Sequence, residues 1–248
     1  MQKGLDFNKF KSKLLNTNHI VEELPELQFL NGLENRDLQD GVVMSSYPRS
    51  GNTLLRSYIE KITGLVTGSD TDISHGLNKA LLTAGLQGEG LVDKRVWVIK
   101  THYPERYGGT EFGAERSILL VRNPLDAIVS VFNLFATRSH TLSVTDDTFV
   151  RFSNVWKSYV EGELKVWREF HKFWLASKIP VHIVRFEDLV SNPNSTLNEL
   201  MKFVLNVKTL ENTTIETYIK LATNQPAPQK YNPRSGKAYA NRDKFGKQ

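Results

Sequence analysis

The sequence of 248 residues contains no cysteine. That absence excludes disulfide bonds, thiolate metal sites and cysteine nucleophiles together, and it fits a reducing compartment. No stretch reaches the ~20 consecutive apolar residues that a membrane-spanning helix needs. The first residues, MQKGLDFNKFKSKLL, also lack the apolar core of a signal peptide. We therefore expect a cytoplasmic protein that does not bind membranes. The alternative is a soluble luminal domain whose N-terminal anchor was removed.

Most of the chain has no net charge. The net charge is +5, and residues 226–248 account for all of it, with six cations and one acid. A nucleic-acid-binding protein more often carries a basic face on its folded body, so we expect no nucleic-acid partner. A short basic tail suits one small anionic ligand, although it is also typical of a solvated terminus.

The remaining composition, with 40% hydrophobic and 24% charged residues, is that of a globular domain. The length favours a single domain over residues 1–248. Within it we assign 1–40 to an N-terminal extension and 226–248 to a basic C-terminal tail that closes on a ligand.

Short apolar runs alternate with helical periodicity along the chain. Strands are expected at 41–46, 96–99, 117–121 and 181–184. Helices are expected at 53–63, 124–137, 148–177 (as two helices meeting near Gly162), 195–205 and 210–221. The segment 65–94 is expected to be mostly loop with one short helix near 78–83. Strands apolar on both faces and separated by helices are typical of a covered parallel sheet. The pattern predicts an α/β fold: one three-layer domain with a central parallel sheet of at least four strands flanked by helices.

Ligands of such sheets bind beyond the carboxyl ends of the strands, so the residues after each predicted strand belong together. Three of these four groups carry a cation: Arg49 follows the first strand, Lys100 the second and Arg122 the third. This edge is therefore predicted to bind an anion.

The segment YPRSGNT at 47–53 joins a predicted strand to a predicted helix. Gly51 allows a sharp turn, and backbone amides at a helix N-terminus form an anion site. The loop is P-loop-like, but it lacks the G-x-x-x-x-G-K-[ST] form of nucleotide triphosphatases. A turn with an ordinary capped helix remains an alternative of about equal weight.

Two further motifs are interpreted in the same way. His102 stands two residues after Lys100, and histidine is the commonest general base; the alternative is a surface histidine in a loop. Ser130 lies in a helix that is apolar nearly all round, so its hydroxyl needs a partner. That partner is either an anion shared with Arg122 or, more ordinarily, the carbonyl of Asp126.

Together these segments resemble the cytosolic-type sulfotransferase family, whose donor is 3′-phosphoadenosine 5′-phosphosulfate (PAPS). The resembling segments, in the family's order, are YPRSGNTLL at 47–55, KTHYP at 100–104, RNPLD at 122–126 with Ser130, FEDL at 186–189 with Asn192 and Pro193, and RSG at 234–236. Five matches in register are far more specific than any one of them.

The resemblance implies transfer of a sulfuryl group from PAPS to an acceptor hydroxyl or amine, without a metal, leaving 3′-phosphoadenosine 5′-phosphate (PAP). His102 is then the general base, and Lys100 and Arg49 neutralise charge on the transferred group. The nucleotide-binding residues implied are Arg49, Ser50, Gly51, Asn52, Thr53, Leu54, Arg122, Ser130, Phe186, Thr223, Arg234, Ser235 and Gly236. The implied partner is a small-molecule or glycan acceptor, and the oligomeric state is left open.

Three positions depart from the family pattern. Arg49 replaces a lysine, Leu54 replaces a tryptophan that stacks on adenine, and Ser235 replaces a lysine of the 3′-phosphate clamp. The alternatives are a P-loop-type kinase with Asp188 as metal ligand and a non-catalytic nucleotide-binding protein.

Overall fold

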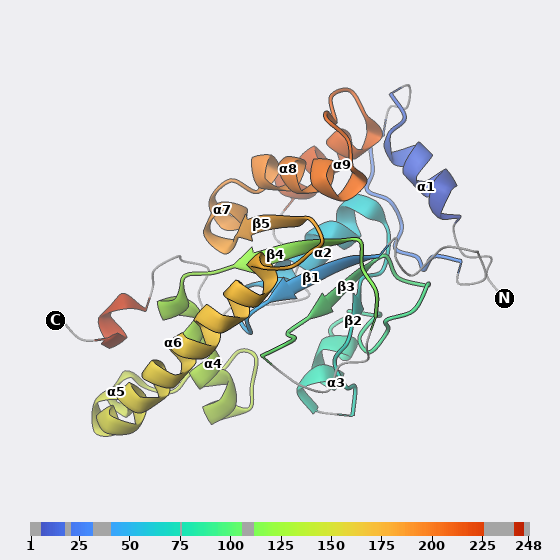
Figure 1. Ribbon diagram of the computed structural model, residues 1–248. Helices are drawn as coiled ribbons and strands as arrows, with labels where there is room; N and C mark the ends of the chain where they lie inside the picture. The colour runs from blue at the N-terminus through green and yellow to red at the C-terminus, as the bar shows by residue number, and fades with distance from the viewer. Residues whose placement is uncertain are drawn as a thin grey trace.

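The computed structural model describes residues 6–17, 21–31, 41–74, 76–105, 112–225 and 241–245 (Figure 1). At its centre lies a five-stranded sheet in the order β2-β3-β1-β4-β5, with every pair parallel. Its strands are β1 (Val42–Ser46), β2 (Gly68–Ser69), β3 (Val98–Thr101), β4 (Arg116–Val121) and β5 (Val181–Arg185). The predicted parallel α/β sheet is thus confirmed.

Both faces of the central strands are buried, as the unbroken apolar runs predicted, whereas Ile183 of the edge strand β5 is 49% exposed. Val42 and Met44 of β1 pack into the core beneath one helical layer, whereas Val43 packs into the core beneath the other. One layer contains α1 (Phe7–Leu14), α2 (Asn52–Thr63), α8 (Pro193–Leu205) and α9 (Thr214–Asn224). The opposite layer contains α4 (Pro124–Thr137) and the long α6 (Ser153–Leu175), extended by α5 (Asp146–Arg151) (Figure 1).

Three short helices connect or follow the main elements. Helix α3 (Gly76–Thr83) lies between β2 and β3 in sequence, α7 (Phe186–Ser191) directly follows β5, and a 3₁₀ helix spans Arg242–Phe245. In the described part of the chain, no helix combines the length and the apolar character that crossing a membrane requires.

Local sequence signals explain two helix ends. Asn123 caps α4 by accepting a hydrogen bond of 2.9 Å from the amide of Leu125, and Pro124 occupies the first turn. Gly64 ends α2 in the left-handed region at φ 67°. Both ends were predicted from these residues.

One expectation was wrong. The helices expected to meet near Gly162 are one helix, α6, which runs through that glycine, and the break lies at Phe152 instead. A single glycine costs a helix interior only ~1 kcal/mol, and the buried Trp156 and Phe170 anchor α6 on both sides of it. The segment 65–94 is mostly loop with one short helix, α3, as predicted, and it also contains the two-residue strand β2, which was not predicted.

Candidate functional site

The loop after β1 presents a set of donors to one small volume. Gly51 adopts φ 101° and begins α2 without a side-chain cap, and the first turn of this helix contains no acid. The amides of Asn52, Thr53 and Leu54 therefore lie at the positive end of the helix dipole. The Ser50 hydroxyl is fully buried, and no described residue hydrogen-bonds to it. This donor set matches an anion such as a phosphate or a sulfate.

Phe186 and Arg122 pack against this loop. A Cβ atom added to Gly51 would lie 2.3 Å from the Phe186 ring, so only glycine permits this approach. The Arg122 guanidinium lies 4.5 Å from the centre of the same ring, and its Nη1 donates to the Arg49 carbonyl at 2.8 Å. Phe186 is 7% exposed and so forms a wall beneath the loop. Its predicted packing against adenine stays a prediction.

The Arg49 side chain turns towards α4. Its Nε donates to the Ser130 hydroxyl at 3.0 Å, and its Nη2 donates to the His140 carbonyl at 3.0 Å. Arg49 itself stands in the left-handed region at φ 64°, which is uncommon for a residue other than glycine. The structure thus brings Arg49, Arg122 and Ser130 together at the end of β4, as the sequence predicted for the last two.

His102 follows β3 and contacts the neighbouring strand. Its Nδ1 lies 2.6 Å from the backbone carbonyl oxygen of Ser46, at the end of β1. A carbonyl only accepts hydrogen bonds, so Nδ1 must carry the proton. In the neutral ring the lone pair then resides on Nε2, which is the arrangement that a general base requires.

Lys100 is the buried cation of the site, at 5% exposed. Its Nζ donates to the Thr71 hydroxyl at 3.2 Å. Burial lowers the pKa of Lys100 to about 8, and the carboxylates of Glu89 and Asp70 partly oppose that shift. The ammonium group is therefore charged at neutral pH but loses its proton readily above pH 8.

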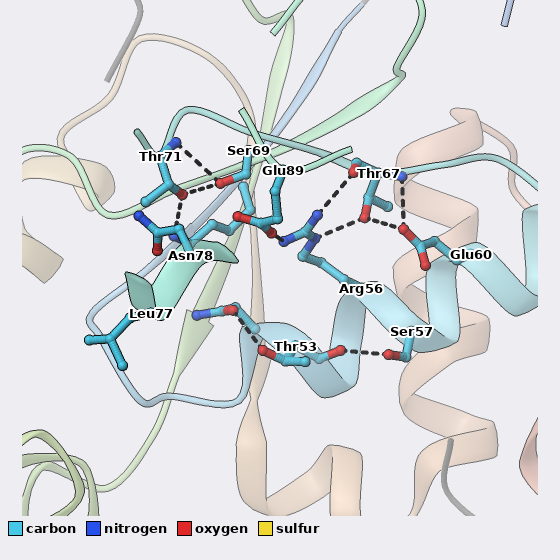
Figure 2. A network of polar contacts seen from close by, with 12 residues as sticks. Thr53, Arg56, Ser57, Glu60, Thr67, Ser69, Thr71, Leu77, Asn78 and Glu89 are labelled. Atoms are coloured by element: carbon cyan, nitrogen blue, oxygen red, sulfur yellow. Dashed lines mark hydrogen bonds and ion pairs between the residues drawn. The ribbon is translucent and has the colours of Figure 1, made fainter. Parts of the chain in front are cut away.

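Figure 2 shows a buried polar network around Arg56, and the charges of Arg56 and Glu89 in this network act on Lys100. Arg56 is 1% exposed and forms an ion pair with Glu89, and it also donates to the Thr67 hydroxyl at 2.8 Å and to the Thr67 carbonyl at 3.0 Å. Glu60 accepts from the same Thr67 hydroxyl at 2.7 Å. This network ties α2 to the segment around β2 that carries Thr71.

Sequence reasoning missed the residues that support the site. Arg56 and Glu60 are charged residues four apart on the buried side of α2, a local signal that could have indicated a buried network. Glu89 and His140 lie in loops with no distinguishing neighbours. Their roles are set by contacts across 33 and 91 residues of sequence, which no local pattern encodes.

Several predicted site residues lie away from these contacts. The Thr223 hydroxyl donates to the carbonyl of Ile219, one turn earlier in α9, at 2.8 Å. The same hydroxyl accepts from the side-chain amide of Asn194 at 3.3 Å. The Leu54 side chain packs against the hydrophobic core between the sheet and the layer that contains α2. Arg234, Ser235 and Gly236 lie outside the described residues.

The described end of the basic tail docks on α4 and α5. The Asn241 amide donates to Asp126 Oδ1 at 3.1 Å, and Lys244 pairs with Asp146 at 3.1 Å. Asp126 lies in the first turn of α4, which directly follows β4. Asn241 is therefore held close to the end of β4. The described residues contain no group of three or more His, Cys, Asp or Glu side chains that could hold a metal ion.

Several known proteins resemble this chain in sequence. A WSCD family member of Aedes aegypti is 32% identical over 161 residues, which cover 64% of this chain and 48% of that protein. WSCD family members of Drosophila pseudoobscura pseudoobscura and Drosophila melanogaster are each 29% identical over 164 residues. The chain therefore spans about half the length of the curated relatives that it matches.

Among solved structures, the sulfotransferase domain of the Synechococcus PCC 7002 olefin synthase covers 70% of this chain and is itself covered to 76%. It aligns with a TM-score of 0.38 and 17% identity. The sequence matches the sulfotransferase domain family over residues 39–237, a range that includes every strand of the sheet together with Lys100 and Arg122. The chain belongs to the sulfotransferase family.

Proposed function

We propose that this protein transfers a sulfuryl group from PAPS to the hydroxyl or amine of a small-molecule or glycan acceptor. The observation that carries the proposal is the convergence of three groups at the carboxyl ends of adjacent strands. Lys100 and His102 lie at the end of β3, the loop from Arg49 to Thr53 follows β1, and Arg122 follows β4. Family membership favours the same reaction.

The residues of the loop fit a 5′-phosphosulfate. The buried Ser50 hydroxyl and the uncapped amides at the start of α2 supply neutral donors, and Gly51 allows Phe186 to pack directly against the loop. We assign the binding of the phosphosulfate to these groups and to the Thr53 hydroxyl. When bound, PAPS supplies an activated sulfuryl group whose sulfur–oxygen bond to phosphate breaks.

Two side chains then act on the reaction. His102 accepts the acceptor's proton on Nε2 while the Ser46 carbonyl holds Nδ1–H in place. Lys100 places a positive charge where negative charge develops, inside a buried environment in which that charge is effective. Glu89 and Asp70 help to keep Lys100 protonated at neutral pH.

The kinase alternative needs a carboxylate that holds a metal at this edge. Its candidate, Asp188, is 51% exposed and pairs with Arg185 of the same turn at 3.6 Å. The ammonium of Lys100 and the guanidinium of Arg122 occupy the strand ends where such a carboxylate is normally found. This placement disfavours phosphoryl transfer.

Single-turnover transfer from ³⁵S-labelled PAPS, screened against hydroxyl- and amine-bearing small molecules and glycans, tests the proposal. A labelled product supports it. Magnesium-dependent transfer from ATP would establish the kinase instead, and tight PAP binding without transfer would establish a binding protein. The cytoplasmic location and the absence of nucleic-acid and membrane partners stay predictions.

A further inference from the structure

We propose that Thr71 is a positioning residue that holds and orients the Lys100 ammonium group through its side-chain hydroxyl. The inference rests on the proposed function, because that proposal places the charge of Lys100 beside the transferred group. Thr71 lies in the loop that follows β2, a segment outside all five of the motifs that carry the family resemblance. A residue next to an edge strand is thereby added to the groups that act at the end of β3.

The first argument is the contact between the two side chains. The ammonium of Lys100 has only donors, so the Thr71 hydroxyl oxygen accepts from Nζ at 3.2 Å. The Thr71 hydroxyl also shares a hydrogen bond with the fully buried Ser69 hydroxyl, and Ser69 Oγ accepts from the Thr71 amide at 3.2 Å (Figure 2). These contacts with Ser69 hold the Thr71 side chain in the orientation that faces Lys100.

The second argument is that Thr71 alone gives the ammonium a direction. Lys100 is 5% exposed, and no other residue in the described part of the chain hydrogen-bonds to Nζ. An ammonium group has three donors, so one contact with Thr71 leaves two for a bound sulfuryl group. Burial lowers the pKa of Lys100 to about 8, and the charged groups that also act on it are Glu89, Asp70, Arg56 and Glu105.

The third argument is that backbone pairing, and not the lysine side chain, places Thr71. Strand β2 runs parallel to β3 with Ser69 beside Lys100. Beyond that pair, the Asp70 amide donates to the Lys100 carbonyl at 3.1 Å, and Asp70 Oδ2 accepts from the Thr101 hydroxyl at 2.5 Å. Loss of the Thr71 hydroxyl should therefore leave the backbone in place while it removes the contact with the ammonium.

The test measures the pKa of Lys100 in the intact, unliganded chain by NMR titration of its Cε resonance, which Lys100→Met assigns. The principal variant is Thr71→Val, which replaces the hydroxyl by a methyl group of similar size, and Thr71→Ser retains the hydroxyl. The matched control is Thr83→Val on α3, where an exposed threonine donates to the Lys79 carbonyl at 3.0 Å. Melting curves verify that each variant is folded. The pH dependence of single-turnover transfer from PAPS is measured on the same chains.

A hydroxyl oxygen that accepts from the ammonium favours its charged form, so Thr71→Val should lower the Lys100 pKa by about one pH unit. The alkaline limb of transfer should move by the same amount, with transfer roughly 10-fold slower at pH 8. Thr71→Ser should keep the pKa within about 0.3 unit of the parental value, and Thr83→Val should match the parent in both measurements.

Three results would overturn the inference: a Lys100 pKa that Thr71→Val leaves unchanged, a parental alkaline limb in that variant, or a Thr71→Ser variant as impaired as Thr71→Val. A parental chain that transfers the sulfuryl group to no acceptor would instead defeat the proposed function. In that case the NMR titration would still decide whether Thr71 holds the ammonium.

Discussion

The Nδ1 atom of His102 lies 2.6 Å from the backbone carbonyl oxygen of Ser46, across the boundary between β3 and β1. Because both residues sit at the carboxyl ends of adjacent parallel strands, the sheet register sets this distance. The contact places the proton of the neutral imidazole on Nδ1 and leaves the lone pair on Nε2. A residue of the central strand thereby determines which nitrogen can accept a proton.

Replacing His102 should abolish transfer without disturbing the nucleotide. We expect His102→Asn to lower the single-turnover rate by ~10²–10⁴-fold, because Asn can retain the hydrogen bond to Ser46 but has no basic nitrogen. PAP affinity should stay within twofold, since in the proposed mechanism His102 acts on the acceptor and not on the nucleotide. His182→Gln, on β5, serves as the control. A His102→Asn variant with nearly the parental rate would show that the base lies elsewhere.

The charge of Lys100 should govern the alkaline limb of activity. Burial lowers its pKa from 10.5 to about 8, so the ammonium that supports transfer disappears as the pH rises through 8. We expect the single-turnover rate to fall over that range. Lys100→Met should have little activity at any pH, whereas Lys172→Met, at an exposed position of α6, should retain the parental profile. A parental rate that is constant from pH 7 to 10 would contradict this role.

The same group affects stability, and the sign follows from its lowered pKa. Below pH 8 both folded and unfolded chains carry the Lys100 proton, and the folded state bears the full cost of the buried charge. Between pH 8 and 10.5 the unfolded chain binds a proton that the folded chain lacks, so this cost disappears. The stability of Lys100→Met relative to the parent should therefore fall by up to about 3 kcal/mol from pH 7 to 10.5, as urea unfolding would measure. A difference that is independent of pH would exclude the shift.

Glu89 should contribute to both stability and pH dependence. Glu89→Gln leaves the buried Arg56 charge without its carboxylate, and breaking such a pair costs ~3–5 kcal/mol. It also removes an acid that raises the pKa of Lys100, so the alkaline limb should move to lower pH. Asp93→Asn is the matched control, because the Arg95–Asp93 pair is half exposed and contributes at most ~1 kcal/mol. Equal losses of stability in the two variants would refute the difference in burial as the cause.

Arg122 should support nucleotide binding through the loop. Arg122→Ala removes the donor to the Arg49 carbonyl and the cation over Phe186, so we expect PAP to bind ~10- to 100-fold more weakly, with less effect on turnover at saturating donor. Arg122→Lys should rescue little, because lysine has no planar face. Arg116→Ala is the matched control. Arg116 lies at the other end of β4, where its guanidinium lies over the Phe203 ring and donates to the Phe203 carbonyl at 2.7 Å. Unchanged PAP affinity in Arg122→Ala would remove the assignment.

Two glycines should respond to alanine in opposite directions. Gly51→Ala forces a Cβ atom against the Phe186 ring at positive φ, so we expect loss of stability and of PAP binding. Gly162 lies within α6 with no atom within 4 Å of an added Cβ, and Gly162→Ala should stabilise the fold by ~0.5–1 kcal/mol. Thermal melting with and without PAP measures both effects. A tolerated Gly51→Ala would disprove the tight packing at the loop.

Sequence alone determined the parallel sheet and the edge at which the site lies. Apolar runs, their alternation with helical segments along the chain and caps such as Asn123 are local signals. They are local because the backbone geometry of a strand or a helix end depends on near neighbours. The cations Arg49, Lys100 and Arg122 could be placed at one edge for the same reason. Gly162 shows the limit of such signals, since its local cost predicted a break that packing of α6 overrides.

Only the tertiary structure decided what each cation contacts. The hydrogen bonds that aim Arg49 join it to Ser130 and His140 across 81 and 91 residues of sequence, and the pair that supports Lys100 joins Arg56 to Glu89 across 33. Side-chain direction depends on which partners the folded core brings within hydrogen-bonding distance, and those partners have no fixed spacing along the chain. The sequence therefore placed the charges at the sheet edge, and the packing of loops and helices around β1 set their separate orientations.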